Sequence, residues 1–238
     1  MADSLSARNA ILTRIREKLG NKSEAAEDVV RYEHASIARL YQRDGKLNGE
    51  KKLQLFVERL EDYDAHVVRT TSDGVQAAID AAIDAAIGAA IGAAIEDGNI
   101  SNILVPVNFP TAWLPTSVAI VRDENSKGMP LANNELDRLH TVLTTASAGI
   151  AETGTLVLEH GAGEGRRALT LVPDRHICVV RASQVVETVP EAFTGIQQRA
   201  TQPITLISGP SATSDIEMTR IRGVHGPRNL VVILVDGV

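Results

Sequence analysis

The chain has 238 residues, a single cysteine and a formal net charge of −6 at neutral pH. One cysteine cannot form an internal disulfide, and this chain alone cannot hold a thiolate-bound iron–sulfur cluster or a four-cysteine zinc site. The acidic balance and an aromatic content of only 3% argue against nucleic-acid binding, because that function usually needs a basic surface and stacking side chains.

Residues 1–62 are expected to form a helical N-terminal extension. Apolar residues share one face between Ser6 and Gly20, and similar stripes predict helices over Glu24–Arg43 and Glu50–Asp62. Ser6 is a candidate N-cap for the first of these helices. No cluster of catalytic residues occurs here, so the extension either packs on the main domain or serves as a partner-binding arm.

The segment 77–95 carries an isoleucine at every fourth position. Each step of four residues advances about 40° beyond a full helical turn, so the isoleucines form a broad apolar face. This predicts a helix packed on a sheet, with a helix-dimer seam as the alternative. Asp80 and Asp84 interrupt the run, and about eleven continuous apolar residues remain, against the ~20 of a membrane span. Because no export signal is visible either, the protein is expected to be cytoplasmic.

Residues 63–238 alternate between strand and helix patterns, which predicts an α/β domain. Helices are expected at Asn134–Leu139 and Val189–Ala200, and short apolar runs predict strands at His66–Thr70, Asn102–Pro106, Ser117–Val121, Thr155–Glu159, His176–Arg181, Ile204–Ser208 and Leu230–Val235. The last three strands are apolar almost throughout, as in an open, mainly parallel sheet flanked by helices. Cys178 lies inside one of them and is interpreted as a buried small hydrophobe rather than a nucleophile.

Sequence motifs for a Walker loop, a dinucleotide-binding turn or a zinc-binding helix are absent, and no metal site is predicted. A first candidate segment is the phrase AETGT at 151–155. Gly154 would let the backbone approach a ligand closely. Thr153 and Thr155 add hydroxyls, and Glu152 adds a carboxylate that could act as base or nucleophile. The alternative is a tight turn with a solvated glutamate.

A second candidate segment, 161–173, is rich in glycine before Arg166 and Arg167. The guanidinium fork matches carboxylate and phosphate groups, so this segment could form an anion pocket. The alternative is a surface loop with solvated arginines.

A third candidate segment runs from 208 to 228. In the part that follows a strand, polar and turn-forming residues are expected at the carboxyl edge of the sheet, where open α/β sheets bind ligands: Gly209, Pro210, Ser211, Thr213, Ser214 and Asp215. Later, His225 stands beside Gly226, which suits a functional group borne on a loop. Turn chemistry alone is the alternative.

Three phrases resemble the lactate-utilization protein C family: AETGTLVL at 151–158, GRRALTLVPDRHICVV at 165–180 and ISGPSATSDIEMTRIRGVHGPR at 207–228. The opening SARNAILTRIREKLG at 6–20 is also similar, whereas the alanine–isoleucine run departs from the family. The resemblance implies a fold like that of sugar-phosphate isomerases, CoA-transferases and formyltetrahydrofolate cyclo-ligases. It further implies a role in oxidising L-lactate to pyruvate beside partner proteins that carry iron–sulfur clusters.

The leading hypothesis is therefore a non-redox subunit of an L-lactate oxidation system that binds no cofactor itself. Arg166 or Arg167 would pair with the substrate carboxylate, and Glu152 or His225 would move the hydroxyl proton. Two alternatives stay open: a stand-alone transferase or cyclo-ligase-like enzyme acting on a phosphorylated or CoA-linked substrate, and a non-catalytic assembly subunit.

Overall fold

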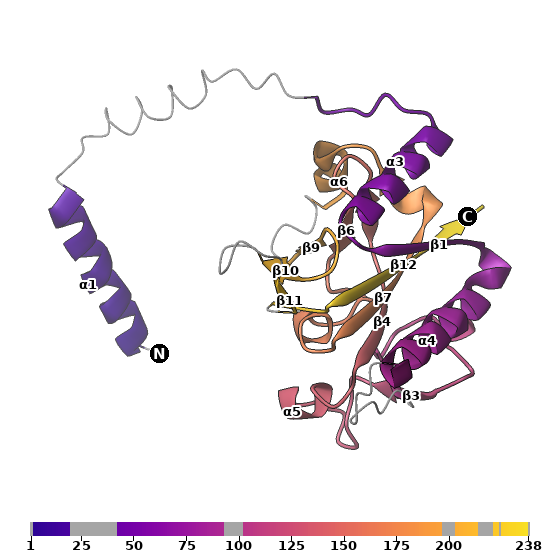
Figure 1. The fold of residues 1–238 in the computed structure, drawn as a ribbon. Coiled ribbons are helices and arrows are strands. Elements are labelled where there is room, and N and C mark those ends of the chain that lie inside the picture. Colours follow the sequence, from indigo (N-terminus) through magenta and orange to yellow (C-terminus); the bar gives the residue numbers. More distant parts are fainter. Residues whose placement is uncertain are drawn as a thin grey trace. The chain divides into compact units, whose positions relative to one another are not determined.

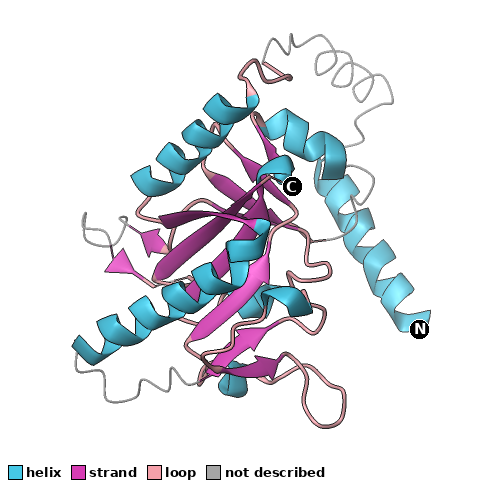
Figure 2. Cartoon of the chain, turned by 90° about the vertical axis from the view of Figure 1, so that its right-hand side faces the viewer, coloured by secondary structure: helices cyan, strands magenta, loops and turns pink. Residues whose placement is uncertain are grey.

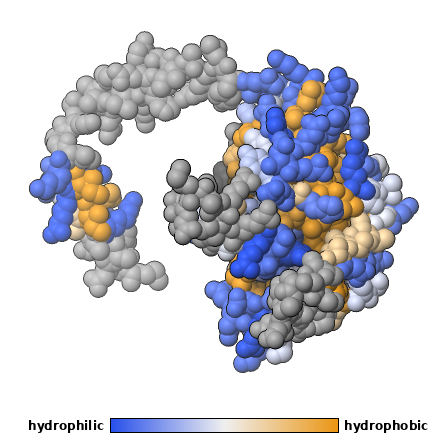
Figure 3. Space-filling view, in the orientation of Figure 1, coloured by the Kyte–Doolittle hydropathy of each residue, from blue (hydrophilic) through white to orange (hydrophobic). Residues whose placement is uncertain are grey.

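The first compact unit, Met1–Tyr41, contains the helix α1 at Ala2–Leu19. A computed structural model of the chain describes residues 2–19, 42–92, 102–196, 203–213, 221–223 and 225–237. The predicted helix is confirmed, but it begins before Ser6, which is therefore not its N-cap. Ile11 and Ile15 of α1 are 58% and 47% exposed, and apolar atoms form a patch between hydrophilic side chains on this helix (Figure 3). The helix predicted over Glu24–Arg43 lies largely outside the described residues.

The second compact unit, Gln42–Val238, is built on a six-stranded parallel sheet (Figure 1). Its strand order is β1-β12-β7-β4-β2-β3, and every neighbouring pair is parallel. The strands are β1 (His66–Thr71), β2 (Asn102–Val105), β3 (Ala119–Arg122), β4 (Thr141–Thr145), β7 (Arg175–Arg181) and β12 (Asn229–Asp236). The expected α/β fold with an open, mainly parallel sheet is confirmed.

Helix α4 (Val75–Gly92) covers one face of this sheet (Figure 2). Ile79 and Ile83 are 0% and 2% exposed and pack with Ile177 of β7 and Ile233 of β12. The sheet-packing role predicted for the isoleucine face is therefore confirmed over the described part of the helix.

Helix α3 (Gly49–Asp62) lies against the opposite face of the sheet, where Phe56 and Leu60 are fully buried. The side chain of Asn48 caps α3 by accepting the backbone N–H of Lys51 at 3.0 Å. Because α3 belongs to this core, the compact unit begins at residue 42 rather than at the predicted boundary of 62/63.

A second, four-stranded sheet has the order β8-β5-β6-β9. Its strands are β8 (Val185–Val186), β5 (Ala148–Ile150), β6 (Thr155–Leu158) and β9 (Thr205–Ile207). β9 pairs antiparallel with β6, so the strand predicted at 204–208 is real but does not belong to the parallel sheet. Helix α6 (Val189–Ile196) packs on this small sheet, and α5 (Asn133–Leu136) packs near β2 and β4.

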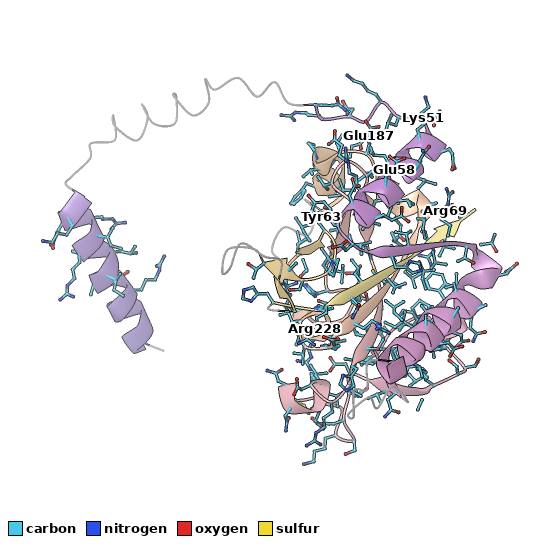
Figure 4. The ribbon with its side chains drawn as sticks, in the orientation of Figure 1. Lys51, Glu58, Tyr63, Arg69, Glu187 and Arg228 are labelled. Carbon is cyan, nitrogen blue, oxygen red and sulfur yellow. The ribbon has the colours of Figure 1, made fainter. Side chains whose placement is uncertain are left out.

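The segment 42–48, which leads into α3, is held by the carboxylates of Glu187, labelled in Figure 4, and Glu191. Glu187 accepts the backbone N–H groups of Lys46 and Leu47 at 2.7 and 2.6 Å. Glu191 accepts the N–H of Gly45 at 2.9 Å, and this hydrogen bond is the main reason that the pKa of Glu191 is lowered. The start of the second unit is thus tied to the region of β8 and α6.

Candidate functional site

A cavity of about 240 Å³ lies where the small sheet meets the beginnings of β7 and β12. Its walls come from the 3₁₀ turn at Arg167–Thr170, the two strand starts, the segment after β9, and residues 225–227. The lining residues are Arg167, Thr170, Leu171, His176, Leu206, Ile207, Ser208, Gly209, Pro210, Ser211, Ala212, His225, Gly226, Pro227 and Leu230. Part of the second candidate segment and much of the third therefore border one cavity.

This cavity lies at the amino edge of the parallel sheet, because His176 and Leu230 are the second residues of β7 and β12. The expected location was the carboxyl edge, where open α/β sheets usually bind ligands. Ser208 does follow a strand, but that strand is β9 of the small sheet. The antiparallel pairing of β9 with β6 brings the segment after β9 to the amino edge of the larger sheet.

Ser211 joins the two halves of the third candidate segment. Its backbone N–H donates to the carbonyl of Pro227 at 2.8 Å, and its own carbonyl accepts the N–H of Gly223 at 2.9 Å. Its hydroxyl oxygen accepts the N–H of His225 at 3.1 Å. Ser211 thus holds the His225 loop against the segment after β9, and the exposed imidazole of His225 borders the cavity.

The AETGT segment reaches the cavity only through a chain of hydroxyls. The hydroxyl of Thr155 lies 2.6 Å from that of Ser208 and 2.7 Å from that of Thr153. Glu152 is exposed, is not among the lining residues, and has its backbone N–H bound to the carbonyl of Glu187 at 3.0 Å. The three predicted loops therefore lie side by side, but the carboxylate of Glu152 does not border the cavity.

Two glycines of these loops are used for close packing. Gly154 has φ +55°, and a Cβ there would lie 2.7 Å from the carbonyl carbon of Arg59 in α3. Gly209 has φ +88°, and its Cβ would lie 2.7 Å from the carbonyl oxygen of Tyr63, which follows α3 (Figure 4). Only glycine adopts such backbone geometry without strain, so both positions allow the loops to approach the end of α3.

The two neighbouring arginines of the second candidate segment have different surroundings. Arg166 donates to both carboxylate oxygens of Asp123 at 2.7 and 2.9 Å and to the carbonyl of Leu131 at 2.5 Å. These bonds to Asp123 raise the pKa of Arg166. The side chain of Arg167 is exposed and lines the cavity. Of the two candidate anion-binding arginines, Arg167 borders the cavity and Arg166 does not.

His176 borders the cavity, yet the sequence analysis considered it only as part of a strand. It is 1% exposed, and burial lowers its pKa to about 4. Its Nε2 lies 2.7 Å from the hydroxyl of Thr144, which in turn donates to the sulfur of Cys178 at 3.7 Å. Burial also raises the pKa of the Cys178 thiol to about 12, which agrees with its interpretation as a buried hydrophobe. The sequence signal that could have identified His176 is a histidine at the start of an otherwise apolar strand.

The remaining predicted positions lie away from the cavity or outside the described residues. Thr213 belongs to β10 (Ala212–Thr213), which pairs with β11 (Ile221–Arg222), and it is not a lining residue. Ser214 and Asp215 fall outside the described residues. Within the described ranges, no group of three or more His, Cys, Asp or Glu could hold a metal ion. None of the helices in those ranges combines the length and apolar character needed to cross a membrane.

Comparison with known protein families gives a match that lies within the second unit. Residues 53–235 match the model of a family described as the LUD domain. The lactate utilization protein C of Deinococcus radiodurans is 49% identical over 140 residues, which span 58% of this chain and 64% of that protein. A protein of the same name from Shouchella clausii is 36% identical over 99 residues, or 40% of this chain and 43% of that protein.

A solved structure is also similar. The crystal structure of a DUF162 family protein from Deinococcus radiodurans gives a TM-score of 0.62 at 35% identity, and the match covers 80% of this chain and 99% of that one. The match with the lactate utilization proteins is less complete, since it spans 64% or less of the lengths of the two relatives named above.

Proposed function

Since this chain belongs to the LUD domain family, we propose that it serves lactate utilization as a subunit of an L-lactate oxidation system, with the cavity beside His176 as its substrate site. Relatives named lactate utilization protein C support the role in lactate utilization. A cytoplasmic location and a relationship to the CoA-transferase group of folds belong to the same proposal.

The size of the cavity, about 240 Å³, is the observation that carries this proposal. Cavities for drug-sized ligands and cofactors usually measure ~300–1,000 Å³, so a small carboxylate fits better than a nucleotide or a CoA ester. Arg167 would pair with the carboxylate, because a guanidinium offers two parallel donors to that group. His225, held at the rim by Ser211, would exchange a proton with the hydroxyl, a role for which imidazole is suited near neutral pH.

Electron transfer would take place in partner proteins. The thiol of Cys178, the single cysteine in this chain, is 0% exposed and stays protonated because burial raises its pKa to about 12. An iron–sulfur cluster is held by several cysteine thiolates, and this chain has one cysteine. Iron–sulfur subunits that accept the electrons are therefore the partners we propose, and this chain would bind and orient the substrate without a cofactor of its own.

Growth on L-lactate as the sole carbon source tests the proposal. A strain that lacks this gene should fail to grow, and the intact gene should restore growth. Arg167→Ala should restore little growth, whereas the matched control Arg138→Ala, at an exposed position outside the cavity, should restore it fully. Normal growth of the deletion strain would refute the role in lactate oxidation.

The two alternative functions predict different results in the same system. A stand-alone transferase or cyclo-ligase-like enzyme would turn over a CoA-linked or phosphorylated substrate as the purified chain, without partners. A non-catalytic assembly subunit would support growth when Arg167 is replaced but not when residues 1–41 are removed.

A further inference from the structure

A second cavity, of about 280 Å³, lies between helix α4 and the larger sheet. Ile177 of β7 packs with α4, and side chains alternate between the two faces along a strand. Arg175, two residues earlier on β7, therefore lies on the α4 face and lines this second cavity. His176 lies on the opposite face and lines the first cavity, described above. The two cavities are thus separate sites on opposite faces of the sheet.

Polar side chains gather at one end of the second cavity. His66, Asn229 and Arg175 are the first residues of β1, β12 and β7, and all three line the cavity. These strands are neighbours in the sheet and run parallel. Because parallel strands begin at the same edge of a sheet, the three residues form a polar mouth at its amino edge.

The rest of the lining is apolar. Val68 and Val231 contribute from β1 and β12. Five alanines at helical spacing share one face of α4 and complete the wall: Ala78, Ala81, Ala82, Ala85 and Ala86. Because alanine side chains are short, they leave space between the helix and the sheet, whereas the isoleucines of α4 fill the adjacent core. The second cavity therefore has a polar mouth and an apolar interior.

The guanidinium of Arg175 is partly buried at this mouth. Within the described ranges, no hydrogen bond or ion pair joins it to another residue. Burial lowers the pKa of Arg175, and the nearby Asp174, itself paired with Arg228 at 3.4 Å, offsets this only in part. Arg166, by contrast, is paired with Asp123, and its pKa is raised. The charge of Arg175 is thus less well compensated than that of Arg166.

We propose that the second cavity binds a monocarboxylate with a short aliphatic chain, whose carboxylate pairs with Arg175 and whose chain lies against the alanines of α4. A guanidinium offers two parallel N–H donors to a carboxylate, and burial of the chain contributes further affinity. Asp64 also lines the mouth, so a phosphate, which carries nearly two negative charges, would be repelled more strongly than a carboxylate. This site is independent of the proposed lactate site.

The size of the cavity limits the length of the chain. Sites for drug-sized ligands and cofactors usually measure ~300–1,000 Å³, and about 280 Å³ is at the lower limit of that range. Each methylene buried in the apolar interior should increase the affinity about fourfold. Loss of the charged pair should reduce the affinity roughly 10- to 100-fold.

Amide NMR titrations of the full chain at pH 7, with hexanoate as the probe, test the proposal. We expect hexanoate to shift the resonances of residues 78–86. Hexanoate should bind roughly 15-fold more tightly than butanoate, which has two methylenes fewer. Hexan-1-ol has the chain without the charge and should bind roughly 10- to 100-fold more weakly than hexanoate.

Two variants with matched controls test the two ends of the cavity. Arg175→Gln should weaken hexanoate binding and remove most of its advantage over hexan-1-ol, whereas Arg138→Gln, at an exposed position outside both cavities, should not. Ala82→Leu places a larger side chain in the interior and should weaken the binding of both molecules. Ala77→Leu, at an exposed position of α4 outside the cavity, should leave their binding unchanged.

The comparison of hexanoate with hexan-1-ol needs only the wild type, so the test stands even if a variant does not fold. Equal affinities for these two molecules, or the absence of shifts at residues 78–86, would overturn the proposal. It is also overturned if Arg167→Ala abolishes hexanoate binding and Arg175→Gln does not, because hexanoate would then occupy the first cavity. None of these results depends on L-lactate, so the proposed function stands or falls separately.

Discussion

Burial of His176 should make the folded protein sensitive to mild acid. The pKa of this side chain falls from 6.5 to about 4 on folding, because the buried site disfavours the charged ring. An unfolded chain then binds a proton that the folded chain rejects between these two pH values, and stability falls as the pH is lowered through this window. Above pH 6.5 the ring is neutral in both states and the unfolding free energy is unaffected; between pH 6.5 and pH 4 protonation of the unfolded chain progressively lowers that free energy.

The size of the effect follows from the shift. One pKa unit corresponds to ~1.4 kcal/mol, so acidification from pH 7 to pH 5 should remove about 2 kcal/mol of unfolding free energy through His176 alone. Carboxylates contribute further pH dependence, since the hydrogen bond from Gly45 lowers the pKa of Glu191 and burial raises the pKa of Glu164. Those contributions are shared by variants that differ only at His176 and cancel in the comparison.

Urea unfolding at pH 7 and pH 5 measures this difference. Wild type should lose about 2 kcal/mol more than His176→Gln between the two values, because glutamine does not titrate. His66→Gln should retain the wild-type pH dependence. If wild type and His176→Gln lose the same free energy, His176 is not held neutral in the folded state and the reasoning fails.

Two further substitutions test packing that the site depends on. Gly154→Ala should destabilise the fold by about 2–5 kcal/mol in thermal unfolding, since it combines a left-handed backbone with a Cβ that collides with α3. The control Gly161→Ala, whose Cβ meets nothing within 4 Å, should cost less than about 1 kcal/mol. Similar losses in the two variants would refute the packing role of Gly154. Arg166→Ala leaves the carboxylate of Asp123, which is 9% exposed, without its cation. Because the side chain of Arg166 is 34% exposed, we expect a loss of about 1–3 kcal/mol in urea unfolding, less than for a fully buried ion pair. An unchanged unfolding free energy would argue against a structural ion pair.

The apolar patterns of the sequence predicted much of the sheet. Leu230–Val235 forms β12, where burial on both faces requires a continuous apolar run. The isoleucine repeat at 77–95 corresponds to α4, where burial on one face requires apolar residues at helical spacing. β9 has a similar apolar run but pairs antiparallel in the small sheet, with Leu206 50% exposed. Hydrophobicity reports burial rather than strand direction, so its sheet could not be predicted. β4 and β5 were not predicted, since threonine, alanine and glycine dilute their pattern.

The candidate site was predictable where turn chemistry and polar groups coincide. Ser211, His225 and Arg167 stand in glycine-punctuated segments and line the same cavity. His176 could not be found in this way, because a single polar residue in an apolar strand is also compatible with an ordinary buried hydrogen bond. The different surroundings of Arg166 and Arg167 depend on Asp123, a partner distant in the sequence, and no local pattern distinguishes the two arginines.

The two carboxylates that hold residues 45–47 also define where the chain can be divided. The backbone donors that they engage all follow Gln42, so a cut immediately before that residue removes none of these bonds. A protein expressed from Gln42 onward should consequently retain an intact start to its fold. Removal of the first forty-one residues would therefore leave these three hydrogen bonds in place at the start of α3.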